Sequence, residues 1–211
     1  MLPGLEALAC PGMAVPMEVM EHVVEVESSR NPFAIGVVGG RLVRQPRRLD
    51  EALATARMLE QKGYDFSIGL AQVNRRNLAK YGLASYAEAF GQCPNLRAGS
   101  RILADCYQRS GANWDKAFSC YYSGDFSTGF RHGYVQRVRD SIRRGRPSEV
   151  PEAKVGVAEA VHLPQGAAAA AVPAVMLQPR DAGVAATAGL PDAGQGWSIP
   201  PIPAGDAAFV F

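Results

Sequence analysis

The chain has 211 residues, 47% of them hydrophobic, and a formal net charge of +2. This is enough apolar material for one or two packed domains, and no apolar run approaches the ~20 residues that a membrane-spanning helix needs. The small charge excess and the lack of a helix-turn-helix or RNA-binding signature argue against nucleic-acid binding. The first residues, MLPGLEALACPG, lack the charged and apolar regions of a signal peptide, so no export signal is evident.

Composition changes sharply at Arg146. The last 66 residues hold nine of the fifteen prolines and seventeen alanines, and they carry 3 Lys+Arg against 6 Asp+Glu, whereas residues 1–145 carry 19 against 14. We therefore expect a folded, basic domain over residues 1–145 and a low-complexity, disordered tail over residues 146–211. The aromatic residues near the end of this tail, Trp197, Phe209 and Phe211, are a candidate segment for docking a partner.

The first predicted elements are a helix, two short strands and a second helix. The helix covers residues 15–29 and must end close to there, because Pro32 biases the residue before it away from helical geometry. The stretch AIGVVGGRLVRQP indicates two strands that meet at Gly39-Gly40, a dipeptide suited to a tight turn. The stretch RLDEALATARMLEQKG predicts a helix that Gly63 closes.

The remaining predicted elements are helical. Asn74 is a candidate N-cap for a short helix that ends at Tyr81, before Gly82. Further helices are expected over residues 95–109, 113–124 and 133–144. The pattern predicts a small, mainly α domain with a minor β-hairpin and no internal repeat.

The four cysteines all lie in the part expected to fold: Cys10, Cys93, Cys106 and Cys120. An even number is compatible with two disulfides in any of three pairings, and also with four buried free thiols. Cys93 and Cys106 are an unfavourable pair, since a helix between them would separate them by roughly 16 Å, beyond the ~7 Å limit for bridged Cα atoms.

Glu27 is a carboxylate on the apolar stripe of the first helix. Counting back from it by helical steps gives Val24, Val23 and Met20. Burial and the negative end of the helix dipole both favour the protonated form, so we expect a raised pKa. A carboxylic acid that stays protonated near neutral pH suits a general acid for a glycosidic oxygen; the alternative is that Glu27 pairs with a basic residue such as Arg30.

Two further stretches carry candidate binding residues. In SIGLAQVN, Gly69 allows a close approach to the backbone, and the amides of Gln72 and Asn74 can recognise hydroxyl and acetamido groups. In FSCYYSGDF, Tyr121 and Tyr122 offer an aromatic platform with hydroxyl groups for a sugar ring. Taken singly, such residues are as readily explained by a turn or by the core.

Taken together and in this order, the motifs resemble those of the lysozyme-like lytic transglycosylases. They are Glu27-Ser28, Gly69-Leu70-Ala71-Gln72, Tyr121-Tyr122-Ser123-Gly124 and Tyr134-Val135. The phrases NPFAIGVVGG, FSIGLAQVN, NLRAGSRIL and CYYSGDF are most similar to the peptidoglycan-cleaving accessory enzymes of type IV secretion systems, over roughly residues 8–142. Three positions depart from the superfamily pattern: Cys120 and Tyr122 replace the alanine and the asparagine of an Ala-Tyr-Asn motif, and Ala71 stands where methionine is common.

The resemblance implies a lysozyme-like helical fold that cleaves the β-1,4 bond between N-acetylmuramic acid and N-acetylglucosamine. Glu27 would be the single catalytic acid; the substrate-binding candidates are Ser28, Gly69, Gln72, Asn74, Tyr121, Tyr122 and Tyr134. Glu27 would protonate the leaving oxygen and then take a proton from the muramyl C6 hydroxyl, which closes a 1,6-anhydro ring. This chemistry needs no metal or cofactor. The expected location is the periplasm, and the expected partners are peptidoglycan and, through the tail, type IV secretion components.

Other groups that could carry chemistry have simpler explanations. Most glycosidases use two carboxylates, but Asp65 and Asp125 lie at loop-like positions where solvated or capping carboxylates are usual. The histidines His22, His132 and His162 are scattered without the spacing of metal ligands. The basic stretch RLVRQPRR is either a solvated loop or a contact for anionic peptide stems. Two other functions remain open: a non-enzymatic, glycan-binding assembly factor and a hydrolysing lysozyme.

Overall fold

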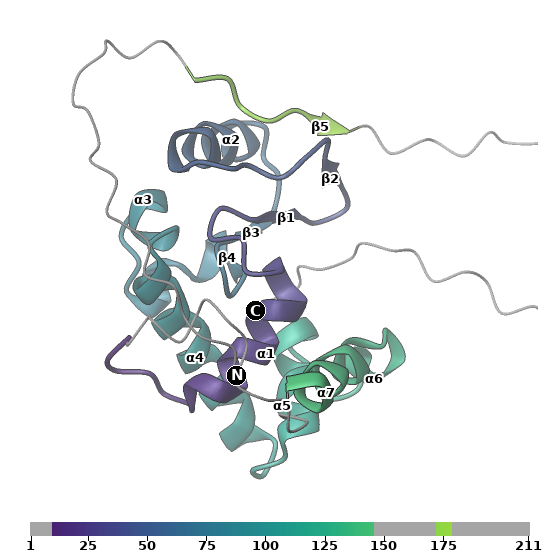
Figure 1. Ribbon diagram of the computed structural model, residues 1–211. Helices are drawn as coiled ribbons and strands as arrows, with labels where there is room; N and C mark the ends of the chain where they lie inside the picture. Colours follow the sequence, from purple (N-terminus) through teal and green to yellow (C-terminus); the bar gives the residue numbers. More distant parts are fainter. Residues whose placement is uncertain (1–9, 146–171, 179–211) are drawn as a thin grey trace, which may run out of the picture.

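The computed structural model describes residues 10–145 and 172–178, which form a mainly helical domain with small sheets (Figure 1). The helices are α1 (Met17–Ser28), α2 (Leu49–Gln61), α3 (Tyr86–Ala89), α4 (Gln92–Arg109), α5 (Trp114–Ser123), α6 (Thr128–Arg131) and α7 (Tyr134–Gly145), with 3₁₀ turns η1 (Arg75–Asn77) and η2 (Ala79–Tyr81). The strands are β1 (Ile35–Val37), β2 (Arg41–Leu42), β3 (Phe66–Ile68), β4 (Val73–Asn74) and β5 (Leu177–Gln178). The predicted mainly α fold is confirmed.

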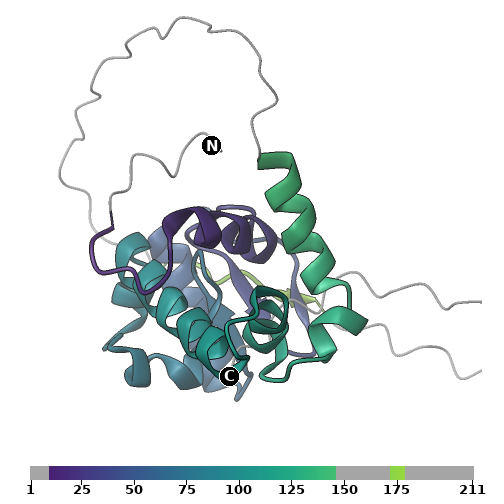
Figure 2. The ribbon, with the colours of Figure 1, turned by 90° about the horizontal axis from the view of Figure 1, so that it is seen from below.

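The strands and α2 lie at one end of the domain, and α1, α5, α6 and α7 lie at the other (Figure 1). Helix α7 runs beside α1 and also packs on α5 (Figure 2). Residues 29–34 lead from the end of α1 directly into β1, and the N–H of Gly69 donates to the carbonyl of Ala34 at 2.9 Å. The last turn of α1 is therefore joined to the sheet by a short, hydrogen-bonded connection.

The structure contains a small β-hairpin, but not at Gly39-Gly40, where the sequence predicted it. In the three-stranded sheet of order β1-β3-β4, Ile35 pairs with Ile68, and Ser67 pairs with Asn74, so β3 and β4 form the hairpin. The strands on either side of Gly39-Gly40 exist as expected, yet β1 pairs with β3 and β2 pairs with β5. The glycine turn therefore separates two sheets.

Residues 172–178 pack against the domain, although they belong to the stretch predicted as a tail (Figure 1). Val175 is only 5% exposed, and its N–H donates to Thr55 Oγ1 at 2.9 Å. The carbonyl of Met176 accepts a hydrogen bond from the N–H of Val43 at 3.0 Å. This segment is thus bound to both α2 and β2. The rest of the predicted tail, with Trp197, Phe209, Phe211 and His162, lies outside the described residues.

The four cysteines form two disulfides, Cys10–Cys93 and Cys106–Cys120, with Cα–Cα distances of 5.3 and 5.7 Å. The pair that helix geometry disfavoured is not formed. Cys93 and Cys106 both belong to α4, so the disulfides tie the two ends of this helix to the start of the domain and to α5.

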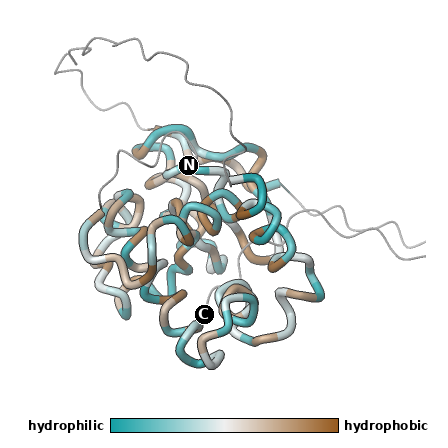
Figure 3. The backbone as a smooth tube through the Cα atoms, turned by 60° about the horizontal axis from the view of Figure 1, so that its bottom comes forward, coloured by the Kyte–Doolittle hydropathy of each residue, from teal (hydrophilic) through white to brown (hydrophobic). Residues whose placement is uncertain are grey.

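Each longer helix buries one face. Hydrophobic and hydrophilic stretches alternate along the chain in Figure 3, as expected for helices around a shared core. Cap residues agree with the sequence: the side chain of Asn113 accepts from the N–H of Lys116 at the start of α5, and Gly124 ends that helix with φ of 76°. Within the described part of the chain, no helix combines the length and apolar character that crossing a membrane requires.

Candidate active site

Glu27 lies in the last turn of α1, on the buried face of the helix. The other buried residues of α1 are Met20, Val23 and Val24, as the apolar stripe predicted. Glu27 retains 9% of its surface exposed, whereas these three residues retain none. The carboxyl group is therefore largely removed from water but not completely enclosed.

The hydrogen-bond partner of this carboxyl group is Tyr134, the first residue of α7. Its hydroxyl donates to Glu27 Oε1 at 2.6 Å, a contact between residues 107 positions apart in the sequence. The alternative ion pair with Arg30 is wrong, because the guanidinium of Arg30 binds Glu25 at 2.8 Å. Glu27 is thus paired with a neutral donor.

Burial raises the pKa of Glu27 from its ordinary value of 4.5 to about 7. The hydrogen bond from Tyr134 and the positive charge of Arg137 act in the opposite direction and keep the increase smaller than burial alone would make it. Arg137 lies beside this pair, with its guanidinium 5.7 Å from the centre of the Tyr134 ring. A pKa near 7 leaves a large fraction of the carboxyl groups protonated at neutral pH, as a general acid requires.

The glycine of the second motif is required by the side chain of Asn95. Gly69 has φ of +81°, and a Cβ atom there would lie 2.4 Å from Asn95 Nδ2. Asn95, fully buried in α4, accepts from the N–H of Ala71 at 2.7 Å and donates to the carbonyls of Ile68 at 3.0 Å and Ala89 at 2.8 Å. Asn95 was predicted only as the start of a helix and not as a site residue, because a polar residue in the first turns of a helix is usually exposed.

Gln72 and Asn74 shape the same loop. Gln72 adopts φ of 45°, and its buried amide nitrogen donates to the carbonyls of Ala34 at 3.1 Å and Gly69 at 2.8 Å. Asn74 accepts from the N–H of Arg76, which confirms the predicted N-cap. The donors of Gln72 thus hold the loop against the connection that follows α1. The predicted contacts of both side chains with glycan stay predictions.

The two tyrosines of the third motif point to different partners. Tyr121 is fully buried, and its hydroxyl donates to the carbonyl of Ala71 at 2.6 Å, which joins α5 to the second motif. Tyr122 stacks on Tyr134, with ring centres 4.8 Å apart and planes inclined by 22°. Both rings lie inside the protein, so their predicted role as a sugar platform stays a prediction. Their observed contacts connect the third motif to the second motif and to Tyr134.

Three other predicted residues have local partners. Ser28 lies directly after Glu27, and its hydroxyl donates back to the carbonyl of Val24 at 3.1 Å. Asp125 caps a turn by accepting from the hydroxyl of Thr128 and from the N–H groups of residues 127 and 128, and these hydrogen bonds hold the pKa of its carboxyl well below the usual range. Asp65 pairs with Arg76 at 3.1 Å. Asp125 therefore has the capping role that the sequence suggested, whereas Asp65 is held in an ion pair and also accepts from the side chain of Asn74 at 3.1 Å.

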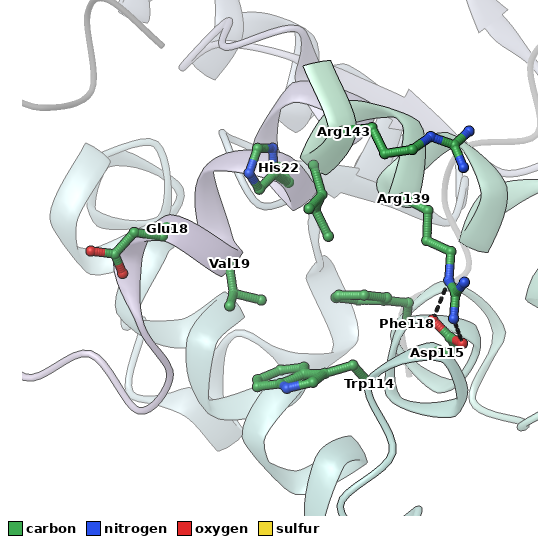
Figure 4. A pocket seen from close by; sticks show the side chains of 9 residues that line it. Glu18, Val19, His22, Trp114, Asp115, Phe118, Arg139 and Arg143 are labelled. Atoms are coloured by element: carbon green, nitrogen blue, oxygen red, sulfur yellow. Dashed lines mark hydrogen bonds and ion pairs between the residues drawn. The ribbon is translucent and has the colours of Figure 1, made fainter. Parts of the chain in front are cut away.

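A separate hollow of about 450 Å³ lies between α1, α5 and α7. It is lined by Glu18, Val19, His22, Trp114, Asp115, Phe118, Arg139, Ile142 and Arg143 (Figure 4). Arg139 and Asp115 form an ion pair across its rim, and His22 is held by a 3.0 Å contact between its Nδ1 and Ser141 Oγ. Glu27 does not line this hollow, so the two sites are distinct.

Known proteins match the part of the chain that contains Glu27 and the candidate substrate-binding residues. Residues 11–142 match the family model described as the transglycosylase SLT domain. The chain is 47% identical over 178 residues to the type IV secretion system protein virB1 of Brucella suis biovar 1, covering 78% of this chain and 72% of the relative. It is 27% identical over 141 residues to protein virB1 of Agrobacterium fabrum, covering 62% and 56%. No solved structure shows a significant match.

Proposed function

Because the chain belongs to the transglycosylase SLT family, we propose that it is a peptidoglycan lytic transglycosylase. It cleaves the β-1,4 bond between N-acetylmuramic acid and N-acetylglucosamine and leaves a 1,6-anhydro ring on the muramic acid. The observation that carries this function is the buried carboxyl of Glu27, with a pKa raised to about 7 and a hydrogen bond from Tyr134. By cleaving glycan strands, it opens the wall locally for a type IV secretion apparatus.

Glu27 performs both proton transfers. Its protonated carboxyl donates to the glycosidic oxygen as the bond to the muramyl C1 breaks, and the leaving sugar departs with a new hydroxyl. The resulting carboxylate then accepts the proton of the muramyl C6 hydroxyl as that oxygen bonds to C1. The group ends in its starting state, and no water is consumed. A pKa near neutrality suits such a group, because it must give up and recover a proton in one cycle.

The other motif residues have proposed roles around this carboxyl. Tyr134 holds Glu27 through its hydroxyl, and Ser28 assists from the end of α1. Gln72 contacts the glycan with the part of its amide not used to hold the loop. Gly69, Asn74, Tyr121 and Tyr122 complete the substrate-binding region as predicted from the motifs.

We propose that the protein acts in the periplasm. Two disulfides suit an oxidising compartment, and peptidoglycan lies in the same compartment. The similarity to a protein named for the type IV secretion system supports components of such a system as partners. The tail was predicted to dock a partner, and we propose that it contacts these components.

Digestion of purified peptidoglycan sacculi tests the activity. We expect soluble muropeptides that carry the anhydro ring, identified by mass spectrometry, and no release by Glu27→Gln. Glu18→Gln, an exposed carboxylate on the same helix, is the matched control and should retain full activity. Products one water heavier at the reducing end would indicate a hydrolase instead. Wild-type protein that binds sacculi and releases nothing across a range of pH would indicate an assembly factor.

A further inference from the structure

Tyr122 contacts Tyr134, the residue whose hydroxyl donates to Glu27. It lies in α5 next to Tyr121, and successive residues of a helix point about 100° apart. Tyr121 therefore reaches the second motif, at the carbonyl of Ala71, while Tyr122 reaches the start of α7. The two neighbouring tyrosines connect α5 to different parts of the site.

The hydroxyl of Tyr134 depends on the orientation of its ring. A tyrosine side chain turns about two bonds, and its hydroxyl lies at the far end, so a small rotation moves the oxygen while the backbone stays in place. The bond from this hydroxyl to Glu27 is 2.6 Å long, and such bonds weaken once the two oxygens separate beyond about 3 Å. A neighbour that restricts the Tyr134 ring therefore also fixes the bond to Glu27.

The ring of Tyr122 is such a neighbour, and it is itself held at its far end. The rings of Tyr122 and Tyr134 stack at 4.8 Å, and only 4% of Tyr122 is exposed. Its hydroxyl lies 3.2 Å from Nδ1 of His132, the residue that follows α6, and the His132 ring meets the Tyr122 ring edge-on at 5.9 Å. The stack thus connects the end of α6 with the first residue of α7.

We propose that Tyr122 is a positioning residue for the transglycosylase reaction: its stacked ring holds the Tyr134 hydroxyl against Glu27. This assignment rests on the proposed function. It gives the tyrosine that replaces the motif asparagine a role inside the protein, acting through Tyr134, in addition to any contact with glycan.

Three variants distinguish the effect of the ring stacking from the effects of the two hydroxyl groups. Tyr122→Met replaces the ring by a flexible apolar side chain, Tyr122→Phe keeps the ring and loses the hydroxyl that contacts His132, and Tyr134→Phe keeps the stack and loses the bond to Glu27. Each is assayed on sacculi for kcat and KM across pH. In parallel, the pKa of Glu27 is measured by NMR titration of protein with ¹³C-labelled glutamate, with Glu27→Gln identifying the signal.

We expect Tyr122→Met to lower kcat about three- to tenfold, the range that corresponds to one aromatic pair, with KM changed less than about twofold. The pKa of Glu27 should rise in this variant and in Tyr134→Phe, because both lose or weaken the hydrogen bond that lowers it. Tyr122→Phe keeps the stacked ring and should therefore leave this pKa at the wild-type value. In the Tyr134→Phe background, Tyr122→Met should have almost no further effect on either quantity, because there is no hydroxyl left to position.

The proposal is overturned if Tyr122→Met leaves the pKa of Glu27 and kcat unchanged, if it changes only KM, or if its effect on kcat is undiminished in the Tyr134→Phe background. If Tyr122→Met does not fold, Tyr122→Leu takes its place, and an unchanged pKa of Glu27 in that variant equally refutes the proposal. An inactive wild type whose Glu27 pKa still rises in Tyr122→Met would refute the proposed function while supporting the positioning role.

Discussion

Replacing Glu27 by glutamine should stabilise the protein at neutral and alkaline pH while removing its activity. Glutamine has the same shape, and its side-chain oxygen can still accept the hydrogen bond from Tyr134, which donates to Glu27 Oε1 at 2.6 Å. The substitution removes only the ionisation of a buried group. A buried acid that stays protonated in the folded protein therefore lowers the free energy of unfolding at every pH at which the unfolded chain ionises it.

The size of this effect follows from the pKa of Glu27, which burial raises from 4.5 to about 7. Below pH 4.5 the group is protonated in the folded and unfolded states, so it has no effect on the pH dependence. Between pH 4.5 and 7 the unfolded chain releases the proton and the folded chain retains it, so the free energy of unfolding falls as pH rises. At about 1.4 kcal/mol per pKa unit, the total loss is about 3 kcal/mol by pH 8.

Urea denaturation of the wild type and Glu27→Gln at pH 4 and pH 8 measures this loss. The other titrating groups are common to both proteins, so they cancel in the difference between the two free energies of unfolding. We expect Glu27→Gln to gain about 3 kcal/mol relative to the wild type between pH 4 and pH 8. Glu18→Gln, the exposed control on the same helix, should change by less than about 0.5 kcal/mol.

A difference that stays constant between pH 4 and pH 8 would refute the reasoning, because it would mean that the carboxyl group of Glu27 titrates alike in the folded and unfolded chain. If the advantage of Glu27→Gln over the wild type became smaller from pH 4 to pH 8, the folded protein would have to stabilise the carboxylate. Either result would also remove the physical basis for Glu27 as an acid near neutral pH.

Three further predictions concern the parts that support the site. Gly69→Ala should reduce stability by about 3 kcal/mol in urea denaturation, because alanine is strained at positive φ and its Cβ would collide with Asn95; unchanged stability would contradict the close packing. Val175→Asp should lower the free energy of unfolding by about 2 kcal/mol, because it either buries a charge or releases the segment 172–178 from the domain. Met176→Asp, at a side chain that is 65% exposed, should leave the free energy of unfolding unchanged. Equal effects of the two substitutions would argue that the segment does not dock. Reducing both disulfides should lower the free energy of unfolding by several kcal/mol. About 4 kcal/mol of this comes from Cys10–Cys93 alone, because its ends are 83 residues apart. A urea midpoint that stays unchanged after treatment with a reducing thiol would contradict this prediction.

The sequence predicted those features that depend on local spacing. Helical periodicity placed Glu27 on the buried face of α1, and the left-handed glycines Gly63, Gly82 and Gly124 follow helices or turns as expected. The raised pKa of Glu27 was also predictable, because burial is the largest influence on this pKa. These conclusions require only neighbours within one or two helical turns.

Features that depend on distant contacts could not be predicted in this way. The strand β3 is buried on both faces, so burial does not alternate along it as it does along a half-exposed strand. The helices α3 and α6 have four residues each, too few to show a helical period of apolar residues. The bond between Tyr134 and Glu27 joins residues 107 positions apart, and the role of Asn95 emerges only when α4 meets the second motif. Motif order indicated that these residues belong together, but not which atoms meet.

The pairing of β5 with β2 determines where the following chain begins. The described segment ends at Gln178, on the edge of the domain formed by β2 and α2 and not at the end of α7 (Figure 1). The local concentration of any partner bound by that chain depends on the distance from its point of attachment. Any partner bound close after Gln178 would therefore be held near the edge formed by β2 and α2, at the end of the domain that carries the small sheets.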